Sequence, residues 1–370
     1  MSGDEGLVAG VVREEMERLG FETRVDELGN VLGTVGTGDG PCLLIDAHMD
    51  TVGVTDASAW SQPPTGSRTG DRLFGRGTMD MKGPLAAAIH GIALLEGRLA
   101  HGRVVVSASV AEELVEGPAL VAVARSVSPD CVLICEATSL QLAVGQRGRA
   151  EIILEVFGRP THSSKPELGV NAADAMVDAI TALRAIELPA HPALGNAILV
   201  LTDVISRPYP GLSVVPDYCA ATFDRRTLPG ETEASLLEPI REILQRTLDL
   251  GDATWQVRIA EDDFACYTGA RIRSPNFAAA WYQDPGLPLV VAALEGMQAA
   301  GLAAQITHYA FCTNGSGTAS LGIPTLGFGP GDEALAHRVD EYIDLDQLEA
   351  AAGGYAAITS RLLEVKPWAR

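Results

Sequence analysis

Apolar and polar positions follow two different patterns along this chain. Over residues 1–149, short apolar runs that predict buried strands are separated by stretches with helical periodicity. The pattern predicts helices at 7–19, 83–97 and 117–127, and strands at 27–35, 42–47, 103–110 and 131–136. We expect a hairpin turn at the Gly-rich 36–40 and a long loop at 56–79, which is rich in Pro and Gly. Strands that alternate with helices indicate an α/β sheet covered on both faces.

The pattern changes near residue 150 and returns near residue 264. Between these points it predicts strand 150–158, helix 171–186, strands 197–206 and 213–226, helix 231–248 and strand 253–260. This β-α-β-β-α-β order is the split, ferredoxin-like arrangement. Beyond it we expect helix 288–301, strands 305–309 and 324–328, and helix 345–365. The chain therefore divides into an outer α/β domain with a mixed sheet (1–149 and 264–370) and an inserted α+β domain (150–263).

Residues that could bind metal follow several of the apolar runs of the outer domain. They are His48, Asp50, Asp80, Glu112, Glu113, Glu136 and His337. In open α/β sheets, ligands bind at the edge where the strands end. Imidazole and carboxylate together suit zinc, cobalt or manganese, and two such ions can activate water between them. As a set, these residues indicate a hydrolase with two metal ions.

Each residue of this set also has an ordinary explanation when it is taken alone. A strand-end histidine, a helix N-cap, an exposed acidic loop and a helix-end histidine would account for His48, Asp80, Glu112-Glu113 and His337. Glu136 is harder to explain as surface, because it follows the apolar run Cys-Val-Leu-Ile-Cys. His48 and Asp50 point to one face of a strand, so Asp50 can accept the second N–H of the imidazole ring. Six coincidences would be needed to dismiss the set.

Composition narrows the classes of partner. A chain of 370 residues is long enough for two domains, and its net charge of −21 argues against a nucleic-acid partner. No apolar stretch reaches the ~20 residues that a membrane span requires, and no signal peptide opens the chain. The six cysteines show no framework spacing, which indicates buried free thiols. We therefore expect a cytoplasmic protein.

Four motifs resemble the M20 family of metallopeptidases and deacylases, which includes acetylornithine deacetylase, succinyl-diaminopimelate desuccinylase, aminoacylase and carboxypeptidase G. They are Asp46-Ala-His-Met-Asp-Thr51, Gly75-Arg-Gly-Thr-Met-Asp-Met-Lys-Gly83, Glu112-Glu113 and Gly327-Phe-Gly-Pro-Gly-Asp-Glu-Ala-Leu-Ala-His337. The resemblance runs from about residue 3 to 365. Within the family, the segments 145–149, 224–226 and 313–315 are similar to hydrolases linked to selenium metabolism.

The resemblance implies a role for each of the seven residues. Two divalent ions are expected, zinc first and cobalt or manganese as alternatives. One would be held by His48, Asp80 and Glu136, and the other by Glu113, Asp80 and His337. Glu112 would be the general base, and Asp50 would orient His48. The family commonly has a cis peptide bond after the bridging aspartate, here Asp80–Met81.

The resemblance also gives the inserted domain the role of a lid and dimerisation domain. His162 matches a lid histidine that reaches the scissile carbonyl from a partner subunit, although a capping histidine on a loop is a competing explanation. Arg226 matches the arginine that binds the substrate carboxylate, and Arg147 matches a second position near substrate. The backbone of the turn at Asn314, Gly315 and Ser316 is expected to face the substrate. The chain departs from many relatives at Ser213, where they carry Asn.

These implications together predict a homodimeric di-zinc hydrolase. It would cleave the amide bond of an N-acyl amino acid or a small peptide, with Glu112 moving the proton. A metallo-exopeptidase or a carbamoyl-amino-acid hydrolase with the same centre is the alternative among enzymes. A non-catalytic metal-binding protein is the alternative from another class, and the presence of Glu112 argues against it.

Overall fold

The computed structural model describes residues 1–36, 39–99, 101–248 and 254–365, which form two compact units. The first unit comprises Met1–Gln146, Asp263–Ser274 and Trp281–Arg370. The second comprises Arg147–Asp262 and Pro275–Ala280. Throughout the described segments, every helix is too short or too polar to cross a bilayer.

The first unit is built on a mixed sheet. Its strands are β1 (Glu22–Val25), β2 (Val31–Gly36), β3 (Cys42–His48), β6 (Arg103–Ser109), β7 (Cys131–Ile134), β8 (Leu142–Gln146), β18 (Trp281–Tyr282), β19 (Ile306–Tyr309) and β20 (Thr325–Gly327). They lie in the order β1-β2-β6-β3-β7-β20-β8-β18, with β19 beside β8. Strands β6, β3 and β7 are adjacent and parallel, with Ile45 opposite Val106 and Leu133. Their carboxyl ends therefore meet at one edge, as the sequence analysis requires.

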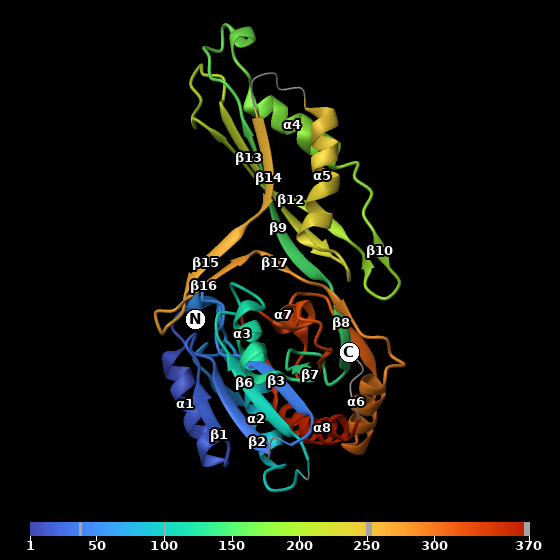
Figure 1. Cartoon of the computed structure of the whole chain (residues 1–370). Helices are drawn as coiled ribbons and strands as arrows, with labels where there is room; N and C mark the ends of the chain where they lie inside the picture. Colours follow the sequence, from blue (N-terminus) through green and yellow to red (C-terminus); the bar gives the residue numbers. More distant parts are fainter. Residues whose placement is uncertain (37–38, 100, 249–253, 366–370) are drawn as a thin grey trace. The chain divides into compact units, whose positions relative to one another are not determined.

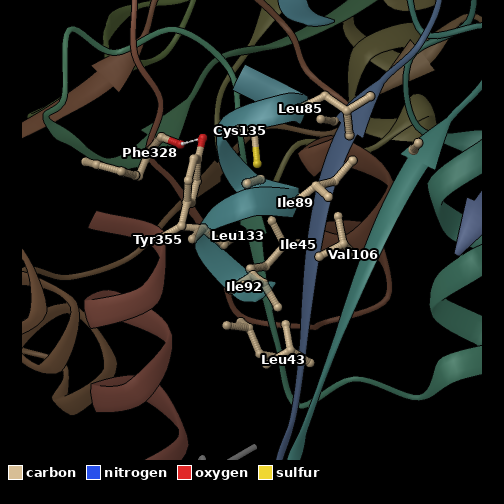
Figure 2. Packing of buried hydrophobic residues seen from close by; sticks show 14 of the residues in the cluster. Leu43, Ile45, Leu85, Ile89, Ile92, Val106, Leu133, Cys135, Phe328 and Tyr355 are labelled. Carbon is tan, nitrogen blue, oxygen red and sulfur yellow. Dashed lines mark hydrogen bonds between the residues drawn. The ribbon is translucent and has the colours of Figure 1, made fainter. Parts of the chain in front are cut away.

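Helices cover both faces of this sheet because its central strands are apolar on both sides. The helices of one face are α1 (Gly6–Arg18), α2 (Gly83–Ala93), α6 (Pro288–Ala299) and α8 (Leu345–Glu364), and α3 (Pro118–Val127) covers the other. Figure 2 shows Leu43 and Ile45 of β3 beside Leu85, Ile89 and Ile92 of α2. Leu44, between them in the sequence, belongs to a separate cluster that contains buried residues of α3. On the first face the Tyr355 hydroxyl donates to the Phe328 carbonyl at 2.9 Å.

The second unit has a five-stranded sheet with helices on a single face (Figure 1), and a short hairpin of β10 (Ala190–His191) and β11 (Gly195–Asn196). Its elements are β9 (Gly148–Phe157), α4 (Ala172–Leu183), β12 (Ile198–Arg207), β13 (Tyr218–Thr227), α5 (Glu233–Thr247), β14 (Thr254–Ile259) and β17 (Phe277–Ala278). The sheet order is β12-β13-β9-β14, with β17 also pairing β9. Asn171 and Thr232 cap the two helices with their side chains. The β-α-β-β-α-β order is the expected one.

Several expected boundaries are wrong. The strand expected at 27–35 begins only at Val31, and the unexpected strand β1 pairs with it in a hairpin, because the Asp26 carboxylate accepts the N–H groups of Gly29 and Asn30 and forms a turn between the two strands. The helix expected to reach residue 97 ends at Ala93, and the strand expected from 213 begins at Tyr218.

The loop expected at 56–79 contains two strands. They are β4 (Ser67–Thr69) and β5 (Arg72–Phe74), which pair with each other, and β5 also pairs with β21 (Tyr342–Asp344) in a small separate sheet. Short polar strands of three residues carry too little alternation to be visible in a sequence pattern. Two expected elements lie partly outside the described residues. They are the turn at 36–40, at residues 37 and 38, and the strand at 253–260, at residue 253.

Candidate metal centre

His48 ends strand β3 and is fixed through both ring nitrogens. The ring is 1% exposed, and its Nδ1 lies 3.1 Å from the Asp50 backbone oxygen and 3.4 Å from the Asp50 Oδ1. Its Nε2 lies 3.1 Å from Asp80 Oδ1 and 3.5 Å from Glu136 Oε1. Nδ1 thus faces Asp50, and Nε2 faces Asp80 and Glu136, which are predicted to bind the same metal ion as His48.

The two adjacent glutamates follow strand β6, and Glu136 follows strand β7. Glu112 is 6% exposed, and its Oε2 lies 3.8 Å from the His48 Nε2. Glu113 faces elsewhere, because its Oε2 lies 2.9 Å from the His337 Nε2. The segments that follow β6 and β7, the two neighbours of β3, therefore place three carboxylates near the end of β3.

Asp80 lies in the short segment Thr78–Lys82 that precedes α2, and its peptide bond to Met81 is cis, as the resemblance implies. Gly77 enters this segment with φ 81°, where a Cβ would meet the Thr51 side chain at 2.5 Å. Glu341, which is fully buried, accepts the N–H groups of Met79 and Asp80 at 3.0 and 3.2 Å. The backbone on both sides of Asp80 is thereby fixed.

The two oxygens of Asp80 point to different histidines. Oδ1 lies 3.1 Å from the His48 Nε2, and Oδ2 lies 3.2 Å from the His337 Nε2. The structure thus forms two groups that could each hold a metal ion, namely His48, Asp80 and Glu136, and Asp80, Glu113 and His337. In each group the ligand atoms lie within 4.8 Å of one another.

The spacing of these atoms fits a small divalent ion. Ligands at the ~2.0–2.2 Å distances of a tetrahedral zinc site are roughly 3.3 Å apart. The four nitrogen-to-oxygen distances of 2.9 to 3.5 Å between neighbouring ligands match this separation. The donor set of nitrogen and carboxylate oxygen suits zinc, cobalt or manganese.

Electrostatics at this edge of the sheet also favours a bound cation. Burial raises the pKa of the Glu112 carboxyl well above its usual range and raises that of Glu136 to about 7. Hydrogen bonds to Asp80 and Glu113 raise the pKa of His337 to about 10. For Asp80, burial acts to raise the pKa, but its contacts with His337 and His48 hold it below the usual value. Without metal, protons must neutralise this carboxylate cluster.

Sequence reasoning missed two groups beside the centre. Glu341 forms an ion pair with Arg76 in addition to its two backbone contacts, and no periodic pattern marks a buried acid after a loop. Lys82 stands close to several carboxylates, and burial lowers the pKa of its ammonium. The position of Lys82, two residues after the candidate ligand Asp80, could have drawn attention to it. The residue type alone does not tell whether the side chain points towards the centre.

The turn at Asn314 lies inside the first unit. The Asn314 side chain is buried, and its Oδ1 accepts the Gly117 N–H at 2.8 Å. Its Nδ2 donates to Asp46 Oδ2 at 3.1 Å and to Ser109 Oγ at 3.0 Å. Gly315 is buried too, and a Cβ there would meet Trp281 at 3.0 Å. The structure therefore gives the Asn314 side chain internal partners.

The remaining predicted site residues belong to the second unit. His162 is exposed, and its Nδ1 accepts the Ser164 N–H at 3.1 Å and lies 2.9 Å from the Ser164 hydroxyl. Arg226 on β13 is half-buried, and its Nε lies 2.9 Å from Asp224 Oδ1. Arg147 donates to the Asn196 carbonyl at 3.2 Å. The side chains of His162, Arg226 and Arg147 thus have different hydrogen-bond partners.

Comparison with known proteins shows what the chain is similar to. A model of peptidase family M20/M25/M40 matches residues 44–361. A protein of Escherichia coli (strain K12) named YgeY is 32% identical, over 96% of this chain and 90% of its own length. Acetylornithine deacetylase of Proteus mirabilis is 29% identical, over 90% of this chain and 84% of its own. The crystal structure of aminopeptidase PepT from Bacillus cereus superposes with a TM-score of 0.75 at 18% identity, covering 98% of this chain and 94% of that one.

Proposed function

The chain belongs to peptidase family M20/M25/M40 and is a metal-dependent amidohydrolase, and we propose that it cleaves the amide bond of an N-acyl amino acid or a small peptide. The observation that carries this proposal is the pair of ligand groups that share Asp80, with the buried Glu112 beside them. Acetylornithine deacetylase among its relatives supports an acylated amino acid as the first substrate class to examine.

Two divalent ions, zinc by preference, would be held by the ligand groups on either side of Asp80. His48 and Glu136 would complete one site, and Glu113 and His337 the other. When bound, the ions supply a Lewis acid for the carbonyl oxygen and lower the pKa of water towards ~7. Asp50 keeps the Nδ1 side of His48 occupied, which leaves Nε2 as the ligand atom.

Glu112 acts as the proton carrier in this proposal. Its carboxylate accepts a proton from the attacking water and returns it to the nitrogen of the leaving amine. Its burial supports the role, because burial raises the pKa of the carboxyl and so makes its carboxylate a better proton acceptor, while two cations nearby would act in the opposite direction. The remaining carboxylates of the cluster are engaged as ligands or, in the case of Asp50, in holding the backbone.

Residues of the second unit would select the substrate and complete the reaction. Arg226 offers a planar fork of donors to the substrate carboxylate, with Arg147 as a second contact. His162 would donate to the developing oxyanion from a partner subunit, and its exposed ring supports this. Asn314 and Gly315 would shape the site through their backbone, because their side-chain positions are buried.

We also propose that the protein is a homodimer. Strand β12 is an edge strand of its sheet, and it carries four exposed aliphatic residues, namely Ile198, Val200, Val204 and Ile205. A long, apolar, unpaired edge normally finds a partner strand. Sedimentation velocity measures the mass in solution, and a species of one chain at micromolar concentration would contradict the dimer.

A substrate panel tests the proposed activity. The protein loaded with zinc should hydrolyse acetylated amino acids, and a parallel panel of dipeptides and carbamoyl amino acids distinguishes the alternatives. Glu112→Gln should retain the bound metal and lose about 10³-fold or more in kcat, because proton transfer has no other carrier. Glu295→Gln makes the same change at an exposed glutamate of α6, outside both ligand groups, and should retain turnover. Full activity in Glu112→Gln would contradict the role of Glu112.

A further inference from the structure

The turn that carries the two adjacent glutamates is held by its backbone in an unusual way. We call residues 110–113 the base turn. Its four consecutive N–H groups all donate to side-chain oxygens from distant parts of the chain. The pairs are Val110 with Asn30 Oδ1 at 3.0 Å, Ala111 with Glu5 Oε1 at 3.1 Å, Glu112 with Asp50 Oδ1 at 3.2 Å and Glu113 with Asp50 Oδ2 at 3.2 Å.

The two acceptors outside the proposed metal site are buried and fixed. Asn30 is fully buried, and its Nδ2 donates to Asp26 Oδ2 at 2.8 Å, which directs the Oδ1 towards the base turn. Glu5 is 2% exposed. Its Oε1 accepts the Ala111 N–H, while its Oε2 has no hydrogen-bond partner among the described residues. A buried carboxylate with so few partners costs stability, so packing alone does not explain it.

The conformation of Ala111 shows why the base turn needs such support. Its φ is 61°, in the left-handed region that a residue with a Cβ adopts at a cost. The Ala111 N–H is bound by Glu5, and the next residue is Glu112. A change at Ala111 would therefore rotate the Glu112 side chain away from its position 3.8 Å from the His48 Nε2.

From these contacts we propose that Glu5 and Asn30 are positioning residues for Glu112. They hold the base turn from the start of α1 and the start of β2, as Asp50 holds it from the end of β3. Neither residue touches substrate or metal in this arrangement. The inference rests on the proposed function, in which Glu112 carries the proton, and it adds residues that the seven-residue set does not contain.

Paired substitutions at Glu5 test the proposal. Glu5→Ala removes the acceptor, and it should lower kcat about 10- to 100-fold with KM and bound metal unchanged, because only the placement of Glu112 is disturbed. Glu5→Gln keeps an oxygen for the Ala111 N–H and should restore most of the turnover. Asp4→Ala, at the exposed neighbour, should behave as wild type. Wild-type kcat in Glu5→Ala, or equal losses in Glu5→Ala and Glu5→Gln, would overturn the proposal.

Hydrogen exchange resolved to single amides provides a readout that does not depend on activity. The amides of residues 110–113 should exchange slowly in the wild-type protein, and that of Ala111 should exchange faster in Glu5→Ala but not in Glu5→Gln. Fast exchange of these amides in the wild-type protein would overturn the proposal even if Glu5→Ala does not fold. If Glu112→Gln stays fully active, the proposed function fails, and the exchange pattern still reports on whether Glu5 holds the turn.

Discussion

The base turn carries the proposed proton carrier, Glu112, and the loop around His162 carries the proposed oxyanion donor, and the two groups are held very differently. In the base turn every backbone N–H has a side-chain acceptor, and Glu112 is buried. His162 is exposed, and among the described residues its ring has hydrogen bonds only with the neighbouring Ser164. The proposed ligands and base therefore belong to a preformed centre, whereas the exposed ring of His162 has a local hydrogen-bond partner and only its backbone pairs with a distant residue, Val214.

This difference shows which polar groups the fold holds in fixed positions. Polar groups at the ends of β6, β3 and β7 share one edge, so that hydrogen bonds among them fix several groups at once. The sheet of the second unit spreads its polar residues over an open face, as with Arg226 and Asp224 on β13. Variants of the proposed ligands at this edge should therefore affect metal binding and turnover together, and variants of the second unit should separate kcat from KM.

The largest effect is expected at the residue shared by both ligand groups. Asp80→Ala removes a ligand from each ion, so bound metal should fall and turnover should decrease roughly 10⁴-fold or more. Metal analysis after gel filtration and a rate assay measure both quantities. Asp130→Ala offers a control, since that carboxylate binds the Cys42 N–H at the opposite end of β3. Full metal content in Asp80→Ala would show that the edge is not the binding site.

A smaller loss is expected when the exposed histidine is removed. His162→Ala should lower kcat by about 10²- to 10³-fold, the usual result of deleting one oxyanion donor, with little change in KM or metal content. His101→Ala removes another exposed histidine and should leave the kinetics unchanged. A change confined to KM in His162→Ala would instead make it a substrate-binding group, and the comparison with Glu112 would fail.

A binding effect is expected on the open face of the second unit. Arg226→Ala should raise KM for a carboxylate-bearing substrate by about 10- to 100-fold, because a charge-assisted hydrogen bond is lost, with kcat much less affected. Arg258→Ala is the matched control, since its arginine lies on β14 of the same sheet and pairs with Glu155 at 3.3 Å. Esters of the substrate carboxylate should show no difference between wild type and Arg226→Ala.

The smallest effect concerns the stability of the metal-free protein. Burial raises the pKa of Glu136 to about 7 from its usual 4.5, so between these values the folded protein keeps a proton that the unfolded chain has released. Stability must then fall as pH rises through this window. His337, with its pKa raised to about 10, extends the fall above its usual 6.5. The melting temperature of chelator-treated protein should be several degrees lower at pH 8 than at pH 5.

Two further samples test the cause of this pH dependence. Glu136→Gln has no proton to lose at this position, so its metal-free melting temperature should vary less with pH. Zinc should remove most of the difference in the wild-type protein, because the ions replace the protons as counter-charges. A metal-free melting temperature that rises from pH 5 to pH 8 would contradict the account of the carboxylate cluster.

The sequence predicts helices and strands where an apolar pattern extends over several residues, or where a capping residue stands directly before the helix. The apolar runs of β3, β6 and β7 and the capped helices α4 and α5 were predicted within a few residues. The hairpin of β1 and β2 was not, because its turn depends on one Asp26 carboxylate within an otherwise extended pattern. The strands β4 and β5 are too short to show alternation.

The site residues divide in the same way. Those marked by their neighbours in the sequence were predictable, and those that bind distant parts of the chain were not. The seven candidate residues were visible because each follows an apolar run or a Gly-rich turn. Glu5, Asn30 and Glu341 were not visible, since the groups they bind lie 106, 80 and about 260 residues away in the sequence. Asn314 was noticed for its motif, but only the structure shows that its side chain joins Asp46, Ser109 and Gly117. Contacts across the fold are what a single sequence does not contain.

The most direct test of the central claim is the anomalous scattering of a crystal grown with zinc. The account predicts two strong peaks on either side of the Asp80 carboxylate, one beside His48 and Glu136 and one beside Glu113 and His337. Data on both sides of the zinc absorption edge identify the element at each peak. A single peak, or peaks away from Asp80, would contradict the two-metal centre from which the proposed function is built.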